Sequence, residues 1–462
     1  MTINGRSADG TTRFEVLNPA TETPWATAPV CSREQLDEAF AVAADAQRAW
    51  ARDEAARTKA LATMADVLDA NTEELAALLT REQGKCRSDA RGEIAAAAIW
   101  YRYYAELDVP ASTAAAPYRT PSGTVQVATF RRPLGVVAAI TPWNFPLTLA
   151  AWKVGPALRA GNTVVLKPSP YTPIATLRFG ELLTDVLPPG VLNVVSGGDE
   201  LGAWMTGHPV PGKVSFTGST ETGKAVAAAA AGDLKRVTLE LGGNDPAILL
   251  DDVDPAAIAE QLFWAAFINN GQACGAIKRI YVHERHHKEL ATQLAAIASA
   301  VRVGDGAEPD TVLGPVNNRP QYERVKELLG EALADGGRLR SGGQPFGERG
   351  YFLTPAIVTD LPETSRLVTE EQFGPVLPLI AYRDVDAAIS AANDTKFGLS
   401  ASVWSAEQAR ARDLGAQLEC GTTWINTHAV TGPHVPTGGS RCTRSMRATR
   451  RSRIPPSRAW LS

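Results

Sequence analysis

Apolar residues recur at helical spacing over the first hundred residues of the chain. Ser32 opens the pattern Ser-Arg-Glu-Gln, a capping box in which the first and fourth side chains satisfy free N–H groups at a helix start. Asn71-Thr-Glu-Glu is a second start signal, because an Asn side chain accepts hydrogen bonds at this position. We therefore expect residues 31–105 to be helical.

The pattern then changes to that of strands. Residues 110–121 are rich in Pro, Ala and Ser and are expected to form a connection, whereas residues 124–130 alternate with the period of a strand. From Leu134, short β-branched runs alternate with helix-length segments. This alternation predicts a doubly wound parallel sheet whose ligand lies beyond the carboxyl ends of the strands. Its strands are expected at 135–140, 163–166, 191–195, 213–216 and 236–240.

A second α/β series follows Gly242-Gly243, where glycines mark a boundary. The fold class is thus α/β, with a doubly wound parallel-sheet domain followed by a second α/β domain. Strands of the second series are expected at 247–250, 279–282, 356–358, 376–380, 399–404 and 422–425. Helices are expected at 254–269, 284–301, 319–335, 384–393 and 405–416.

Composition places the chain among ordinary globular proteins. Its 462 residues, 44% hydrophobic and 21% charged, suggest two or three domains, and no signal-peptide core or bilayer-length apolar run is expected. The cysteine count argues against a disulfide framework and a structural zinc site, because it is odd and includes no CxxC pair. We therefore expect a cytoplasmic protein. The five cysteines are at 31, 86, 274, 420 and 442.

Charge is unevenly distributed along the chain. Residues 440–462 contain seven Arg and no acidic residue, so the remainder holds 39 basic against 50 acidic side chains, a net charge of −11 compared with −4 for the whole. An acidic body argues against a nucleic-acid partner. The abrupt change to an Arg/Ser/Pro-rich end is expected for a reading-frame change; the alternative is a divergent basic tail.

Cys274 is the first residue with candidate chemistry. It follows Asn270-Gly271, where a turn is expected, in the segment Phe-Ile-Asn-Asn-Gly-Gln-Ala-Cys. A cysteine in such a loop can be a nucleophile if a neighbouring group favours its thiolate and substrate can reach it. The alternative is a small buried hydrophobic residue.

Three polar residues stand at or just after predicted strand ends. Glu240 could act as a general base, and the Asn144 amide could donate to an oxyanion. Lys167 could bind ribose hydroxyls or a phosphate. The plainer alternatives are an ion-paired edge residue, a turn-forming Asn between prolines and a solvated lysine.

A glycine turn follows another predicted strand, in Phe216-Thr-Gly-Ser-Thr-Glu-Thr-Gly-Lys-Ala225. Backbone N–H groups at the start of the next helix could hold a pyrophosphate, although a plain tight turn is the alternative. The segment fails the P-loop pattern because Ala225 stands where Mg²⁺ needs a hydroxyl, so an NTPase is disfavoured. The cluster His283-Glu-Arg-His-His287 lacks metal-ligand spacing, and no metal site is expected.

Six motifs occur together in one fixed order, and the series resembles the aldehyde dehydrogenase superfamily from about residue 15 to about residue 436. The motifs are Thr-Pro-Trp-Asn-Phe-Pro, Lys-Pro-Ser, Phe-Thr-Gly-Ser, Leu-Glu-Leu-Gly-Gly, Gly-Gln-x-Cys and Glu-Glu-Gln-Phe-Gly-Pro.

The resemblance implies an NAD(P)-dependent, hydrolytic enzyme. Cys274 would be the nucleophile, Glu240 the base that activates the deacylating water, and the Asn144 side chain with the Cys274 N–H the oxyanion hole. Cofactor contacts are implied for Lys167 at the adenosine ribose, Gly218 and Ser219 at the pyrophosphate, Glu371 at the nicotinamide ribose, and Trp143, Gly242 and Phe373 in the crevice; Ser169 is also implied to bind the cofactor.

The same resemblance implies the reaction and the domain plan. An aldehyde would be oxidised to its acid through a thiohemiacetal and a thioester, with NAD or NADP as hydride acceptor. A coenzyme A-acylating relative and a cofactor-binding pseudoenzyme are the alternatives. Residues 1–109 and 131–242 would bind cofactor, 243–426 would carry the nucleophile, and 110–130 with 427–462 would join subunits of a homodimer or homotetramer.

Three further features bear on specificity and activity. Pro170 stands where NAD-preferring relatives often have a glutamate, which predicts use of both cofactors. No charged pair is evident in the expected substrate tunnel, around 152–154 and 263–267, so an apolar or aromatic aldehyde is expected. The atypical end, with Thr437 in place of an aromatic residue, predicts an exposed sheet edge that could make the chain unstable or inactive.

Overall fold

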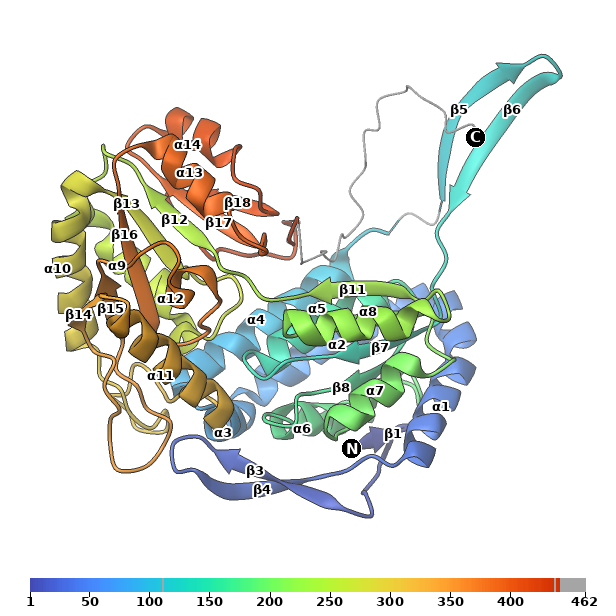
Figure 1. Cartoon of the computed structure of the whole chain (residues 1–462). Helices are drawn as coiled ribbons and strands as arrows, with labels where there is room; N and C mark the ends of the chain where they lie inside the picture. Colours follow the sequence, from blue (N-terminus) through green and yellow to red (C-terminus); the bar gives the residue numbers. More distant parts are fainter. Residues whose placement is uncertain (110–111, 436–437, 441–462) are drawn as a thin grey trace.

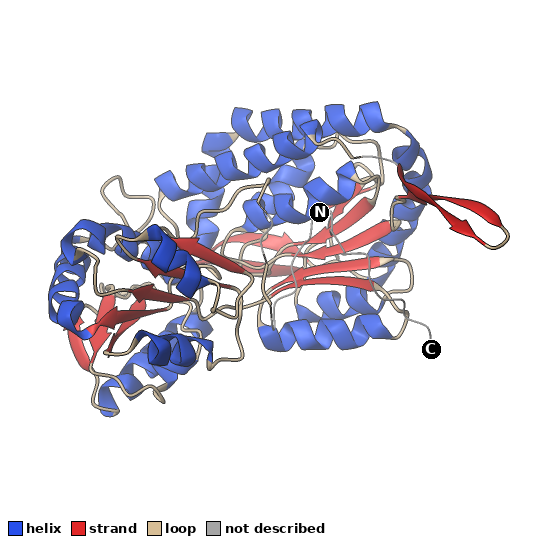
Figure 2. Ribbon diagram, turned by 90° about the horizontal axis from the view of Figure 1, so that it is seen from above, coloured by secondary structure: helices blue, strands red, loops and turns tan. Residues whose placement is uncertain are grey.

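The computed structural model describes residues 1–109, 112–435 and 438–440. The expectations for residues 110–111, 436–437 and 441–462, including the change of composition and Cys442, lie outside these described residues. Within them, two seven-stranded sheets with helices on both faces form the body of the molecule (Figures 1 and 2). The predicted α/β class with parallel-sheet domains is confirmed.

The first sheet contains the five predicted parallel strands. The strand order is β11-β10-β7-β8-β9-β1-β2, with β1 antiparallel to both of its neighbours. β1 and β2 are too short to leave a periodic signal, and the sequence did not predict them. The bounds are β1 (Thr2–Ile3), β2 (Arg6–Ser7), β7 (Val136–Ile140), β8 (Thr163–Lys167), β9 (Leu192–Val194), β10 (Lys213–Thr217) and β11 (Arg236–Glu240).

The second sheet has the order β14-β15-β16-β13-β12-β17-β18 and is parallel except for β14. β14 was not predicted, because its polar alternation lies on an exposed edge. The bounds are β12 (Pro246–Leu249), β13 (Arg279–His283), β14 (Arg338–Ser341), β15 (Ala356–Thr359), β16 (Val376–Tyr382), β17 (Ser400–Trp404) and β18 (Thr422–Ile425).

Helices cover both faces of each sheet (Figure 2). Around the first sheet are α1 (Arg33–Arg52), α2 (Glu54–Ala70), α3 (Thr72–Gln83), α4 (Arg87–Glu106), α5 (Pro146–Arg159), α6 (Ile174–Leu182), α7 (Asp199–Gly207) and α8 (Thr220–Ala231). Around the second are α9 (Pro255–Phe267), α10 (Glu284–Ala300), α11 (Arg319–Ala334), α12 (Arg366–Thr369), α13 (Val385–Asn393) and α14 (Gln408–Gly415). No described helix is both long and apolar enough to cross a bilayer.

The two predicted helix starts have different outcomes. The capping box at Ser32 is confirmed, since its side chain accepts from Gln35 N and the Gln35 side chain accepts from Ser32 N. Asn71 does precede α3, but the predicted capping hydrogen bond is wrong. Its side chain donates to Val67 O at 2.8 Å instead, because α2 ends directly against α3 and the Asn side chain satisfies the last turn of α2.

The connection predicted before residue 121 is wrong over 112–120. That segment is β5 (Ser112–Thr120), paired antiparallel with the predicted strand β6 (Gly123–Phe130) in a hairpin that projects from the body (Figure 1). Pro117 is tolerated in β5 because the register shifts between Ala115 and Tyr118. A second hairpin pairs β3 (Arg13–Asn18) with β4 (Thr23–Pro29), and it was not predicted from the sequence.

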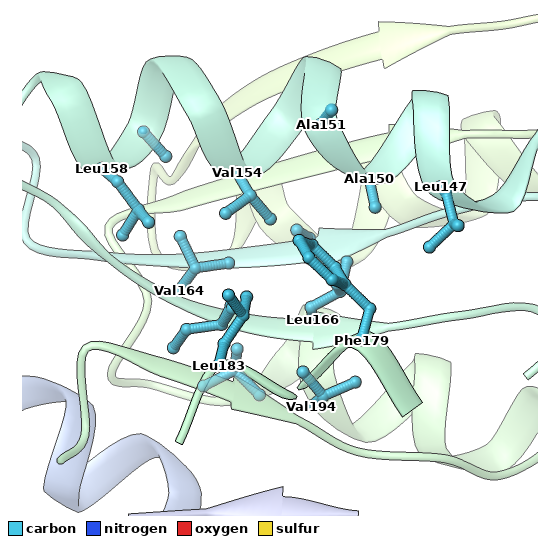
Figure 3. Close-up of a cluster of buried hydrophobic side chains, with 14 of the residues drawn as sticks. Leu147, Ala150, Ala151, Val154, Leu158, Val164, Leu166, Phe179, Leu183 and Val194 are labelled. Atoms are coloured by element: carbon cyan, nitrogen blue, oxygen red, sulfur yellow. The ribbon is translucent and has the colours of Figure 1, made fainter. Parts of the chain in front are cut away.

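Helix α5 is fixed on the first sheet by one apolar face. Its Leu147, Ala150, Val154 and Leu158 follow helical spacing and are buried against Val164 and Leu166 of β8 and against residues of α6 and β9 (Figure 3). Burying each large aliphatic side chain contributes about 1.5–3 kcal/mol. This packing fixes the start of α5, and therefore the loop before it, relative to the strand ends.

Parallel register brings the ends of the strands to one edge. Ile140 of β7 pairs with Lys167 of β8, and Thr217 of β10 pairs with Glu240 of β11. The chain leaves β7 toward β8 and returns later to β10, so the switch point of the sheet lies between β7 and β10. A ligand is expected at that point, beyond the carboxyl ends of the two strands.

Candidate active site

Lys167 ends β8 with its ammonium group inside the protein. Only 4% of the residue is exposed, and burial lowers its pKa to about 8, while Asp199 at the start of α7 opposes this shift. Among the described residues its one hydrogen bond is to the Pro168 carbonyl, at 3.3 Å. A buried ammonium group with so few hydrogen-bond acceptors is suited to bind a ligand that supplies hydroxyls or a phosphate. Ser169 is buried beside it and accepts from Tyr171 N.

The glycine turn after β10 leads directly into the start of helix α8. A Cβ on Gly218 would lie 2.5 Å from the Phe216 ring, so only glycine fits. Ser219 is the N-cap of α8 and accepts from Thr222 N at 3.2 Å. The N–H groups and dipole of this helix start suit an anion. Lys224 donates to Glu221 on the exposed side of the helix.

Four further residues proposed for the cofactor lie together near the second sheet. The Glu371 carboxylate accepts from Gly243 N at 3.1 Å and lies so close to Gly242 that a side chain on Gly242 would displace it. Burial raises the pKa of Glu371. Trp143 and Phe373 meet edge to face with ring centroids 5.3 Å apart. The structure thus brings together residues predicted from three separate motifs.

The loop carrying Cys274 is held by buried amides. Helix α9 ends at Phe267, two residues earlier than predicted, because Asn269 and Asn270 adopt left-handed conformations with φ of 50° and 59°. The Gln272 side chain donates to Asn269 O at 2.9 Å and accepts from Asn317 N at 2.9 Å. The predicted turn before Cys274 is confirmed.

A cavity of about 410 Å³ contains the three proposed catalytic residues, Cys274, Glu240 and Asn144, in its wall. The expected tunnel is only partly correct. Trp152 lines the cavity, but residues 263–267 do not, because Phe263 and Phe267 of α9 are buried in the core of the second sheet. The rest of the wall includes Asp89, Gly92, Glu93, Ala96, Phe145, Thr148, Leu149, Thr217, Ile268, Asn269, Ala273, Gly275, Leu399, Ser400, Thr422, Trp424, Ala429 and Thr431.

Asn144 is held by its side chain and by its carbonyl. Its Nδ2 donates to Gln272 O at 2.9 Å, which leaves the second N–H of the amide for another acceptor. Its carbonyl accepts from Asn269 Nδ2 at 3.0 Å and from Lys85 Nζ at 2.9 Å. Sequence reasoning predicted the amide donor but missed these supports.

Lys85 belongs to a fully buried ion pair. Its Nζ lies 2.5 Å from Glu93 Oε2, and neither side chain is exposed. The other Glu93 oxygen accepts from Leu147 N at 2.8 Å and Thr148 N at 3.3 Å, the free N–H groups at the start of α5. The pair therefore joins α4, the Asn144 loop and α5. Its Lys-x₇-Glu spacing was visible in the sequence, but nothing indicated burial.

The surroundings of Cys274 disfavour its thiolate, although a nucleophilic cysteine was expected to have a neighbouring group that favours it. Cys274 is half-buried, and burial raises the pKa of its thiol to about 12. Lys278 lowers this pKa, but Glu371, Asp245 and Glu240 raise it. Near neutral pH the thiol is therefore protonated, and its reaction needs a base.

Lys153 lies close to Glu240, and it was not predicted from the sequence as a site residue. Its Nζ donates to Thr217 Oγ1 at 2.7 Å and to Ser215 Oγ at 3.3 Å. Burial lowers its pKa to about 7, and the charge of Glu240 opposes this shift. A lone lysine in the apolar segment 147–158 is the signal that could have found it, since a charge is rarely buried without a partner.

Comparison with known proteins decides the family. The model of the aldehyde dehydrogenase family matches residues 6–451. The chain belongs to the aldehyde dehydrogenase family. It is 39% identical over 452 residues to phenylacetaldehyde dehydrogenase of Pseudomonas fluorescens, covering 95% of this chain and 90% of that one.

Solved structures of similar fold include enzymes that use NADP or bind NAD+. An Escherichia coli NADP-dependent enzyme matches with a TM-score of 0.92 and 34% identity, covering 96% of this chain and 92% of that chain. Betaine aldehyde dehydrogenase of Staphylococcus aureus in complex with NAD+ matches with a TM-score of 0.91 and 30% identity, covering 96% and 89%. As a member of this family, the protein is an NAD(P)-dependent enzyme that oxidises aldehydes.

Proposed function

We propose that this aldehyde dehydrogenase works through Cys274 as nucleophile and Glu240 as base, and releases a free carboxylic acid. The observation that carries the proposal is the shared cavity, whose wall contains Cys274, Glu240 and Asn144. In the first step the thiol sulfur attacks the aldehyde carbon while a base takes the thiol proton. The free amide N–H of Asn144 and the Cys274 N–H receive the oxygen as it becomes negative.

Glu240 acts in the second step. The bound nicotinamide supplies a hydride acceptor, so a thioester remains on Cys274. Glu240 takes a proton from a water molecule that attacks this thioester, which releases the acid and returns the thiol. Lys153 of α5, whose ammonium donates to Thr217 at the end of the neighbouring strand β10, places a positive charge near the carboxylate of Glu240. This second step favours the hydrolytic reaction over acyl transfer to coenzyme A.

Residues at the sheet edge are suited to hold the dinucleotide. We assign Lys167 and Ser169 to the adenosine ribose, Gly218 and Ser219 to the pyrophosphate, and Glu371 to the nicotinamide ribose, with Trp143, Gly242 and Phe373 around the ring. Support comes from the poorly paired Lys167 ammonium, the open helix start at Ser219 and the Glu371–Gly243 hydrogen bond. The first sheet would then be the cofactor domain and the second the catalytic domain, with residues 110–130 and 427–462 joining subunits.

We propose an uncharged aromatic or apolar aldehyde as substrate. The wall offers Phe145, Leu149, Trp152, Ile268 and Trp424 for contact, and its charged residues within the described part are all carboxylates. A relative at 39% identity is a phenylacetaldehyde dehydrogenase, which agrees. The compartment we propose remains the cytoplasm, since the four described cysteines are unpaired.

An aldehyde panel tests this proposal. With NAD+ present, phenylacetaldehyde is expected to have a kcat/KM at least about 10²-fold above that of an aliphatic aldehyde that also carries an ionised carboxylate. The reason is that this carboxylate would be repelled by Asp89 and Glu240 in the cavity wall. Asp89→Asn should narrow the difference. Equal use of both aldehydes would contradict the assigned class, and reduction dependent on coenzyme A would favour the acyl-transferring alternative. Cofactor binding without any reduction would favour the pseudoenzyme.

Cofactor choice gives a pH prediction. We expect turnover with both NAD and NADP, as Pro170 implied, although Asp199 supplies a carboxylate near Lys167. Protonated Lys167 attracts the 2′-phosphate, and its pKa is about 8. The ratio of kcat/KM for NADP to that for NAD should therefore fall as pH rises from about 7 to about 9.

Steady-state kinetics with each cofactor across this range provide the measurement. Lys167→Met should remove the pH dependence of the ratio. No turnover at saturating NADP would refute dual use, and a ratio independent of pH in the unmodified enzyme would refute the role of Lys167.

A further inference from the structure

Lys278 is a buried cation directly behind the candidate nucleophile. It lies just before β13, and only 1% of the residue is exposed. Its Nζ donates to the carbonyls of Ala273 and, at 3.3 Å, of Ala276. Its own backbone is fixed as well, since its N–H donates to Asp245 O and its carbonyl accepts from Gln372 Nε2. Nothing in the proposed reaction so far uses this side chain.

The hydrogen bond from Lys278 reaches the peptide group that joins Ala273 to Cys274. The carbonyl of this peptide accepts from the ammonium and, at 3.2 Å, from Ala276 N, while its N–H forms no hydrogen bond with a described residue. Both residues line the cavity. The free N–H is the one assigned to the oxyanion hole. We propose that Lys278 is a positioning residue of the oxyanion hole, which fixes and polarises the Ala273–Cys274 peptide through its carbonyl.

Two physical effects support this role. A charged donor on a peptide carbonyl makes a stronger hydrogen bond than a neutral one, and it strengthens the N–H of the same peptide as a donor by roughly 10–30%. The contact also holds the peptide plane, so the N–H needs no reorientation when the oxygen becomes negative. Removing one oxyanion donor typically lowers kcat by about 10²–10³-fold.

Lys278 also sets the charge balance at the thiol. Carboxylates oppose a thiolate at Cys274 from three elements: Glu240 at the end of β11, Asp245 before β12 and Glu371 after α12. Lys278 is the cation that favours it, and the Lys278 side chain is in turn faced by Glu371, Asp245 and His428. Without the lysine, the cation that lowers the pKa of the thiol would be lost, so this pKa would rise further.

The test separates positioning from simple packing. Lys278→Met keeps the length of the side chain but has neither charge nor donor. We expect kcat to fall by about 30–300-fold with little change in KM for aldehyde, and cofactor affinity to be unchanged. Alkylation of Cys274 by iodoacetamide at a fixed pH near 8 should slow by about tenfold or more, because each unit of thiol pKa changes the thiolate fraction tenfold. Lys278→Arg should retain most of both activities.

Lys235→Met is the matched control, since Lys235 is a buried lysine paired with Asp233 at the other end of β11. It should leave kcat and alkylation unchanged. Lys278→Gln, which keeps an N–H donor without charge, replaces the Met variant if that variant fails to fold; its alkylation should also slow. Normal kcat and alkylation in a folded Lys278→Met or Lys278→Gln enzyme would overturn the proposal. This inference depends on Cys274 being the nucleophile, which the Cys274→Ala variant tests separately.

Discussion

Replacing Cys274 by alanine is expected to abolish aldehyde oxidation, with kcat lower by at least about 10⁴-fold. The reason is that no covalent adduct can form without the sulfur, and hydride cannot leave an aldehyde that has gained no nucleophile. Cofactor affinity should be unchanged, because the residues assigned to the dinucleotide belong to other loops. Steady-state rates and nucleotide fluorescence titration provide the two measurements.

Cys420→Ala is the control for this experiment. Cys420 is also half-buried and unpaired, but its Sγ contacts Thr422 O and Thr423 Oγ1 rather than the large cavity. Its replacement should leave kcat within a few-fold of the unmodified enzyme. Retained turnover in Cys274→Ala would refute the nucleophile assignment.

Glu240→Gln is expected to separate the two halves of the reaction. The first half releases one equivalent of reduced cofactor per chain, and the second half then stalls, because glutamine cannot take the proton of the attacking water. Steady-state kcat should fall by about 10²–10⁴-fold, the usual contribution of a general base. Stopped-flow absorbance of the reduced cofactor measures both phases.

Glu284→Gln is the control for this experiment. Glu284→Gln removes a carboxylate that pairs with Arg383 at the surface, and it should change neither phase. If Glu240→Gln gave no initial burst, Glu240 would also be the base that takes the thiol proton in the first step. If its steady-state rate were normal, Glu240 would have no catalytic role.

Much of the fold could be predicted because its signals are local. The capping box at Ser32 depends on residues three apart, and the buried parallel strands depend on short β-branched runs. The failures involve tertiary context. Asn71 bonds backward to α2 rather than forward to α3, and β5 pairs across a bulge that no composition rule could show. Exposed β14 carries too few apolar residues to be recognised.

The candidate site was predicted where one topological rule governs it. Because parallel strand ends share an edge, the sequence could place Lys167 and Glu240 on the same edge of the sheet. Contacts between distant segments were not predictable. Lys85, for example, reaches the Asn144 carbonyl over 59 residues, and nothing in its own segment indicates that it is buried.

The central claim is that the acyl group passes through the sulfur of Cys274. The most direct test is to mix the Glu240→Gln enzyme with phenylacetaldehyde and NAD+, quench with acid after the burst, and determine peptide masses. The account predicts one phenylacetyl group per chain, on the peptide that contains Cys274. A full burst of reduced cofactor with no acyl group on Cys274, or with the group on another residue, would contradict it.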